Sequence, residues 1–436
     1  MLQTIMPKTI AAALLGAVLA FNAGPALSAD AASADDTARF LAGLPISPLS
    51  SLTPLTFDGV WQQHARHFDA MFGRTENVEL SKIRAFSQDR LSEKHDTLLY
   101  TFAGPDFLFA TSFFPGESTY ILAGLEQIGD VPPLTSLSRG TIDQSLQSLE
   151  VSLGTILNYS FFITHNMKTQ LYNGPVFGTL PILYVFLART GKTIHSVSFV
   201  GLDEQGNLLP GSDAGDGAAG KRGVRNAASK GVKIVFSSGA GPNQTLYYFS
   251  TNLADDSVDH TGFLQFCAKF GQVDAFIKSA SYLLQTGRFN KVRDFLLDHS
   301  ATVLQDDTGI PLSHFDPKMW RFQAFGRYNG PLNISGATYQ PRMGELFRNA
   351  TPIDFGVGYR WRTNESNLVL AQKTGSKASN GELTPRLPPD RNPRAAGTQQ
   401  PSRKRAESES ADTAKAGCGF PGIFSFCSNS QTRTSQ

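Results

Sequence analysis

The sequence is poor in several features that would narrow down its partners. Its 436 residues hold 39 Lys and Arg against 37 Asp and Glu, so the formal net charge is only +2. A charge this small gives no strong field for nucleic acid or for anionic lipid. After residue 30, no apolar run approaches the ~18 residues that a membrane-spanning helix needs. We therefore expect a soluble protein with no nucleic-acid partner and no transmembrane segment.

Motifs of familiar enzyme classes are missing too. The chain has no Gly-x-Ser-x-Gly elbow, no Ser-x-x-Lys pair and no His-Glu-x-x-His helix. Residues 215–222, GDGAAGKR, spell Gly-x-Gly-x-x-Gly, but no strand pattern precedes them and no amphipathic helix follows. Arg222 stands where a P-loop needs a hydroxyl for magnesium, and in RTGKT (189–193) Phe186 replaces the leading glycine. These patterns predict no nucleotide, no cofactor and no metal centre.

Cysteine is scarce, with three residues in the chain. Cys418 and Cys427 bracket the segment CGFPGIFSFC near the C-terminus, and we expect a disulfide between them in an exported protein. Cys267 lies in the apolar helical pattern FLQFCAKF, where a buried thiol is the simplest interpretation.

The N-terminal segment has the layout of a secretory signal peptide. Lys8 supplies a positive charge, an apolar run follows from Ile10 to Phe21, and small residues then lead to a cleavage site. We assign residues 1–29 to the signal and expect a periplasmic or secreted protein. The alternative is a buried N-terminal helix of the mature fold.

Composition divides the remaining chain. We expect residues 30–373 to be globular and residues 374–436 to form a disordered tail, because the tail is rich in Pro, Ser, Gly and charge and nearly free of large apolar side chains. A Gly-rich stretch at 206–230 separates two patterned parts, 36–205 and 231–373. It is either an excursion between two strands of one sheet or a linker between two subdomains.

Hydrophobic periodicity predicts the secondary structure. Apolar residues at helical spacing indicate helices over 57–72 and 142–157. The runs TLLYTFA, FLFATSFF and STYILAGL, separated by GPD and PGE, predict three meander strands at Thr97–Ala103, Phe107–Phe113 and Ser118–Leu125.

Later segments continue the mixture. TIHSVSFVGLD, GVKIVFSS and QTLYYFSTNL alternate as strands do, whereas LPILYVFLAR fits a buried helix or a buried strand. Helices are predicted at His260–Phe270, Val273–Thr286 and Phe289–His299, and a strand near Phe355–Trp361. Strands and helices in separate clusters favour an α+β fold, with antiparallel meander sheets packed against amphipathic helices.

Among candidate site residues, Asp306 and Asp307 stand out in VLQDDTGIPLSHF, with His314 seven residues further on. Two carboxylates held close together raise the pKa of one of them, which suits acid–base chemistry or a divalent cation. An Asp before Thr-Gly also caps a turn through its own backbone.

Weaker candidates come singly. Asp106 in GPDFLFA and Glu126 in AGLE lie at predicted strand ends, which often face clefts and as often cap turns, and His165 occupies a similar position in THNMK. His64 and His67 in HARH have the spacing of two metal ligands, but His64 falls in the apolar stripe of its helix.

The segment KSASYL offers Lys278, Ser279 and Ser281 as parts of a nucleophilic site, at helical spacing and with no nearby histidine. The 32 phenylalanines, against 11 tyrosines and 3 tryptophans, indicate either a deep apolar core or a pocket for a lipid-like ligand.

The run YTFAGPDFLFATSFFPGESTYILAGLE, together with KSASYLL and QDDTGIP, resembles a group of secreted or lipid-anchored bacterial envelope proteins with no assigned activity. The resemblance covers about Phe57–Trp361, implies a bacterial envelope location, and transfers no functional residue. We expect an exported soluble protein with a binding or accessory role in the envelope. The alternatives are a secreted or periplasmic hydrolase that uses Asp306 and Asp307, and a carrier of an apolar ligand.

Overall fold

A computed structural model describes residues 32–91, 95–162, 174–213, 227–334 and 336–374. The predicted signal peptide (1–29), the glycine motif at 215–222, His165 and the Cys418–Cys427 pair lie outside these residues, as does the predicted tail apart from Thr374.

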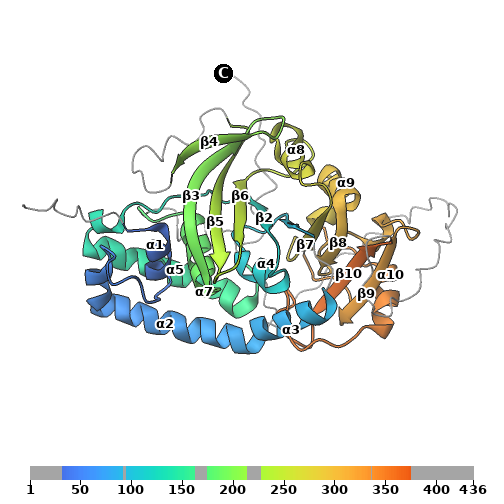
Figure 1. The fold of residues 1–436 in the computed structure, drawn as a ribbon. Coiled ribbons are helices and arrows are strands. Elements are labelled where there is room, and N and C mark those ends of the chain that lie inside the picture. Colours follow the sequence, from blue (N-terminus) through green and yellow to red (C-terminus); the bar gives the residue numbers. More distant parts are fainter. Residues whose placement is uncertain (1–31, 92–94, 163–173, 214–226, 335, 375–436) are drawn as a thin grey trace, which may run out of the picture.

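The centre of the molecule is one mixed sheet of ten strands in the order β4-β3-β5-β6-β2-β1-β7-β8-β10-β9 (Figure 1). The strands are β1 (Thr97–Tyr100), β2 (Thr119–Gly124), β3 (Lys192–Leu202), β4 (Leu208–Asp213), β5 (Ser229–Ser238), β6 (Asn243–Ser250), β7 (Val273–Ile277), β8 (Ser300–Gln305), β9 (Trp320–Gly326) and β10 (Asn367–Lys373).

Five neighbouring strands, β6, β2, β1, β7 and β8, run parallel to one another. Ranked by their place in the chain, they lie in the order 3-2-1-4-5, which is the order of doubly wound nucleotide-binding sheets. The chain leaves β1 toward β2 on one side and later returns to β7 on the other side. Antiparallel strands extend the sheet at both flanks, with β4 and β9 at its edges.

Helices cover both faces of this sheet (Figure 1). They are α1 (Ala34–Leu41), α2 (Gly59–Thr75), α3 (Ser81–Arg90), α4 (Phe107–Phe113), α5 (Arg139–Tyr159), α7 (Leu180–Arg189), α8 (Phe263–Ala268), α9 (Asn290–His299) and α10 (Pro341–Leu346). The helices α1, α2, α3, α4, α5 and α7 pack in one apolar cluster with Leu98 and Tyr100 of β1. The helices α8, α9 and α10 pack in a second cluster with Leu99, because successive side chains of a strand point to opposite faces.

The predicted antiparallel meander is wrong. Residues 107–113 form the helix α4 instead of a strand, and β1 and β2 pair in parallel. Asp106 caps the helix, since its carboxylate accepts a hydrogen bond from the Phe109 N–H at 3.2 Å. Every residue of α4 is buried, so the segment has no polar face, and a short apolar run of this kind fits a helix as well as a strand.

The predicted helix at Val273–Thr286 is also wrong in its first part. Val273–Ile277 is the parallel strand β7, and a turn with the short 3-10 helix Leu283–Gln285 follows it. Parallel strands are buried on both faces and therefore read as continuous apolar runs without alternation. All five residues of β7 are buried in this way.

Other predictions agree with the structure. The helices α2, α5 and α9 form where the apolar stripes indicate them, and LPILYVFLAR is the helix α7. The strands β3 and β5 pair antiparallel across the stretch 206–230, so strands from both patterned parts of the chain lie in one sheet. Cys267 is buried in the second apolar cluster. Within the described residues, no helix has the length and apolar character to cross a bilayer.

Candidate functional site

Charged side chains meet where the parallel strands end. The loop after β1 leads to Asp106, Lys278 directly follows the last residue of β7, and Asp306 and Asp307 directly follow β8. Parallel strands bring their carboxyl ends to the same edge of a sheet, and ligands of such sheets bind outside that edge, at the point where the strand order reverses. Here that point lies at β1 (Figure 1).

Lys278 and Asp106 form a buried ion pair across this edge. The Lys278 Nζ lies 2.7 Å from Asp106 Oδ2, and each side chain is 2 % exposed. The ammonium also donates to the Ser160 carbonyl at 2.6 Å and lies 3.4 Å from the centre of the Phe109 ring. The Tyr100 hydroxyl donates to the same Asp106 oxygen at 2.9 Å. Burial lowers the pKa of Lys278, while Asp106 opposes this shift.

Asp306 points toward the turn that follows β7. Its Oδ2 accepts a hydrogen bond from the Ser279 N–H at 2.8 Å, and its Oδ1 accepts one from the Thr308 N–H at 2.9 Å. The second contact is the turn-capping geometry that the Asp-Thr-Gly pattern offers as the alternative to catalysis. Burial and the charge of Asp307 raise the pKa of Asp306 to about 6.

Asp307 points the other way. Its Oδ2 accepts hydrogen bonds from the Tyr282 hydroxyl at 2.9 Å and from an Arg360 guanidinium nitrogen at 3.1 Å. Arg360 also donates to the Gly330 carbonyl at 2.6 Å. The two adjacent carboxylates are therefore held by different partners, and Arg360 comes from the segment that the sequence predicts as a strand near Phe355–Trp361.

Glu79 adds a further carboxyl group from the helical layer. It is buried, and its pKa rises to about 7, mainly through burial, although Lys278 and a hydrogen bond with Ser160 oppose the rise. The cluster thus holds the carboxyl groups of Glu79, Asp106, Asp306 and Asp307 against the two cations Lys278 and Arg360. Burial is the main reason that the pKa values of Glu79 and Asp306 are raised, and the neighbouring carboxylates add to it.

The turn after β7 has an unusual backbone. Ser279, Ser281 and Tyr282 all have positive φ, at 56°, 50° and 60°. Non-glycine residues rarely adopt this conformation, and it tends to occur at functional sites. The Ser281 hydroxyl bonds to the Tyr359 hydroxyl at 2.5 Å, whereas the buried Ser279 Oγ has no hydrogen-bond partner among the described residues.

Gly358 lies against this turn. A side chain at Gly358 would come within 2.4 Å of Ser279 Oγ and 2.7 Å of Asp306 Oδ2. Its N–H donates to Ser160 Oγ at 3.1 Å. The Ser279 hydroxyl and the Asp306 carboxylate thus both lie against Gly358, where they leave no room for a side chain.

The structure unites three of the five predicted site residues. Asp106, Asp306 and Asp307 belong to one charged cluster, which we call the edge cluster together with Glu79, Lys278 and Arg360. His314 is exposed, and the charged groups that act on it are those of Arg293 and Asp294. His165 lies outside the described residues.

The edge cluster also contains residues that sequence reasoning missed. The apolar pattern predicts Lys278 on a helix, whereas it directly follows the strand β7. Glu79 and Arg360 come from distant segments, and no local pattern connects them with the aspartates. The only local hint for Arg360 is its place in a segment with an alternating pattern.

His64 and His67 have another role. Both contact Glu150 of α5, at 2.8 Å and 3.3 Å, and the buried His64 also contacts the Leu41 carbonyl at 2.9 Å. These contacts connect α1, α2 and α5. Within the described residues, no group of three or more His, Cys, Asp or Glu side chains could hold a metal ion.

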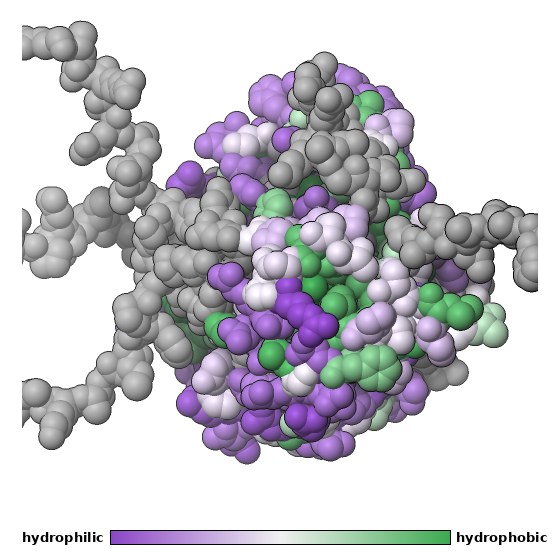
Figure 2. Space-filling model, turned by 90° about the vertical axis from the view of Figure 1, so that its left-hand side faces the viewer, coloured by the Kyte–Doolittle hydropathy of each residue, from purple (hydrophilic) through white to green (hydrophobic). Residues whose placement is uncertain are grey.

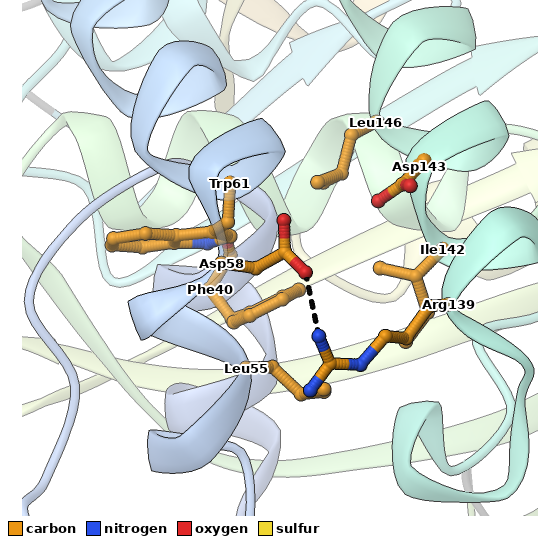
Figure 3. Close-up of a pocket in the computed structure, with 8 residues that line it drawn as sticks. All are labelled: Phe40, Leu55, Asp58, Trp61, Arg139, Ile142, Asp143 and Leu146. Carbon is orange, nitrogen blue, oxygen red and sulfur yellow. Dashed lines mark hydrogen bonds and ion pairs between the residues drawn. The ribbon is translucent and has the colours of Figure 1, made fainter.

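A small pocket lies away from the edge cluster, between α1, α2 and α5. It holds about 230 Å³ of space, part of it open to solvent. Trp61, Phe40 and Leu146 line it, and the ion pair of Asp58 with Arg139 spans it at 3.0 Å (Figure 3). On the side of the molecule where these helices lie, apolar residues gather in a hollow beside hydrophilic ones (Figure 2).

Comparisons with models of protein families, with curated proteins and with solved structures found no match to this chain.

Glu79 predicts a measurable pH dependence of stability. Its folded-state pKa of about 7 lies above the ordinary 4.5, so the native protein keeps a proton that the unfolded chain releases. The stabilisation from this proton is complete below pH 4.5 and disappears as the pH rises to about 7, a loss of up to ~3 kcal/mol in the free energy of unfolding.

Urea denaturation between pH 4 and pH 8 measures this effect as the difference between wild type and Glu79→Gln. The difference should change across the stated window, because glutamine cannot titrate. Glu204→Gln, whose side chain is 62 % exposed, is the matched control and should follow the wild type. A difference between wild type and Glu79→Gln that stays constant with pH would contradict the assignment.

Proposed function

We propose that the protein is an exported binding protein of the bacterial cell envelope, and that it binds a small polar ligand at the edge cluster. One observation carries this proposal: the parallel strands reverse their order at β1, and buried charged side chains gather at the carboxyl ends of β1, β7 and β8. In sheets of this kind the crevice at the reversal point is the usual ligand site.

The hydrogen bonds of Asp306 and Asp307 favour binding over hydrolysis by this pair. Donors from the protein itself already occupy the carboxylate oxygens: the Ser279 and Thr308 N–H groups on Asp306, and Tyr282 and Arg360 on Asp307. A carboxylate that serves as a base must instead reach a proton of the substrate. Asp306 and Asp307 are better suited to fix the conformation of the turns beside a bound ligand.

The pocket between α1, α2 and α5 gives little support to the carrier of an apolar ligand. Only about 10 Å³ of it can be reached by the centre of a water molecule, which is room for about one water and far less than a lipid-like ligand needs. Most phenylalanines of the described residues pack in or against the two apolar clusters of the core, which accounts for them without a ligand.

Ligand mapping tests the location of the site. Purified full-length protein is screened by thermal shift against a set of nucleosides, sugars, amino acids and short-chain fatty acids. Any compound that stabilises the protein is then mapped by hydrogen–deuterium exchange. We expect protection of the loops after β1, β2 and β7, at 101–106, 125–129 and 278–282. Protection of the helices around Trp61 instead, or no stabilising compound in the set, would contradict the proposal.

Export is tested by the N-terminus of the protein expressed in a bacterium. A signal peptide at 1–29 predicts that the abundant form in the periplasmic fraction or the medium begins close to residue 30. Lys8→Glu should slow this processing, because the positive charge before the apolar run is part of the signal. N-terminal sequencing that finds intact Met1 on abundant cytoplasmic protein would disprove export.

One observation favours a second function, acyl transfer or hydrolysis by Ser279. Its hydroxyl oxygen is buried and has no hydrogen-bond partner in the part of the chain that the structure describes, it belongs to a turn of positive φ two residues after β7, and it lies against Gly358. Serine nucleophiles of other α/β enzymes occupy turns of a similar kind. As the Ser279 oxygen attacks a carbonyl carbon, the proton that it loses would pass to the departing alcohol or amine of the substrate.

A fluorophosphonate probe tests this second function, since it labels activated serine hydroxyl groups. We expect labelling of the wild type, none of Ser279→Ala, and full labelling of Ser281→Ala, which keeps the unpartnered hydroxyl. Absence of labelling in the wild type, or equal labelling of Ser279→Ala, would remove the nucleophile and leave the binding proposal in place.

A further inference from the structure

We infer that the protein binds the surface of a lipid bilayer through the loop at residues 44–57, with Leu49 and Phe57 inserted below the lipid headgroups. The inference goes beyond the ligand site proposed at the edge cluster and concerns another part of the molecule, the face formed by α1 and the start of α2. We call residues 44–57 the apolar loop; it includes the short 3-10 helix Thr53–Phe57.

The first support is a long stretch of sequence without charge. Between Arg39 and Asp58, the chain reads FLAGLPISPLSSLTPLTF, and none of these residues is Asp, Glu, Lys, Arg or His. A surface that meets only water normally mixes charged residues of both signs. The apolar loop therefore has the composition of a segment that leaves water, although it lies at the surface.

The second support is the exposure of two large apolar side chains of this loop. Leu49 is 95 % exposed and Phe57 is 75 % exposed, the two highest values for large apolar residues in the described part of the chain. A single exposed apolar side chain is common, but several on one uncharged loop mark a contact with another molecule or with a membrane. Side chains that protrude this far can enter a fluid lipid layer, which needs no matching groove.

The backbone of the apolar loop is paired within the loop itself. The N–H groups of Ser50 and Thr53 donate to the carbonyls of Ser47 and Ser50, each at 3.0 Å. The Leu49 N–H donates to the Ser47 hydroxyl at 3.3 Å, and the Thr53 hydroxyl donates to the Ser47 carbonyl at 2.9 Å. Three prolines in the loop have no N–H to pair. Internal pairing of this kind is what an apolar medium requires of a backbone.

The place where the described chain begins favours a bilayer as the partner. Residue 32 lies two positions before α1, and α1 contacts the loop, since Asp36 accepts a hydrogen bond from the Ser47 N–H at 3.0 Å. The apolar run Ile10–Phe21, which we expect to enter the membrane during export, ends ten residues before residue 32. Ten extended residues span at most ~35 Å. Export therefore brings the face with the apolar loop next to the membrane.

A protein partner or a charged lipid surface fits the apolar loop less well. Protein interfaces surround their apolar centre with a polar rim that forms hydrogen bonds across the contact, and the donors named above are already used within the loop. A formal net charge of +2 gives no strong attraction to anionic headgroups. Insertion of apolar side chains, whose strength grows with the buried apolar area, is the contact that remains.

Flotation with phosphatidylcholine vesicles tests the inference, with the protein purified from the periplasmic fraction or the medium. We expect the wild type to float with the vesicles, and Leu49→Ser and Phe57→Ser each to partition about tenfold or more weakly, because burial of one such side chain contributes about that factor. Binding should persist in 1 M NaCl, where charges are screened beyond ~3 Å. Both side chains are exposed, so the variants should melt at the temperature of the wild type.

Met319→Ser is the matched control. Met319 is 49 % exposed and directly precedes β9, at the flank of the molecule opposite to α1 (Figure 1), so its replacement should leave flotation unchanged. Equal flotation of the wild type and the two loop variants, or none of the wild type, would overturn the inference. So would flotation only with phosphatidylglycerol that is lost in 1 M NaCl, since this would be a contact between charges. A dimer without vesicles that Leu49→Ser converts to a monomer would assign the loop to a second copy instead.

Leu49→Trp gives a local measurement that does not depend on where the N-terminus of the purified protein lies. Tryptophan is favoured at membrane interfaces, so this variant should float like the wild type. Its additional fluorescence should shift to shorter wavelength when vesicles are added. An emission that stays unchanged would place position 49 in water and contradict the inference. A protein that inserts this loop and binds no small ligand would contradict only the function proposed for the edge cluster.

Discussion

The buried ion pair between Lys278 and Asp106 holds the edge of the sheet together. It joins the loop after β1 to the end of β7, across the point where the strand order reverses, and it draws in the Ser160 carbonyl and the Phe109 ring. Burial of two charges costs several kcal/mol per ion unless hydrogen bonds satisfy both partners. Tyr100, Ser160 and the Phe109 N–H supply those bonds. The pair therefore ties the parallel strands to the helical layer in one fixed arrangement.

An excess of acid around this pair gives the edge its chemical character. Arg360 compensates Asp307, and burial raises the pKa of Glu79 to about 7 and that of Asp306 to about 6. With four carboxyl groups against two cations, the edge accepts hydroxyl and ammonium groups more readily than anions.

Sequence reasoning succeeded where one side of an element faces water. The stripes of α2 and α5 and the alternation of β3, β5 and β6 are visible because polar and apolar positions take turns. It failed for α4 and β7, which are buried on all sides and show only apolar runs. For the site, turn residues identified Asp106, Asp306 and Asp307. Glu79 enters from the helical segment before β1, and Arg360 from a segment 53 positions after Asp307, relations that only the fold reveals.

The edge strand β4 affects whether the sheets of two copies of this protein can pair edge to edge. It forms one margin of the sheet, and it contains Pro210, which pairs with Val200 next to an irregularity in the register. Proline has no N–H to offer, and a bulge twists the backbone away from a flat template. The row of backbone N–H donors along this edge strand is therefore interrupted. A second copy of the chain cannot pair with the edge over its full length, which opposes edge-to-edge aggregation into fibres at high protein concentration.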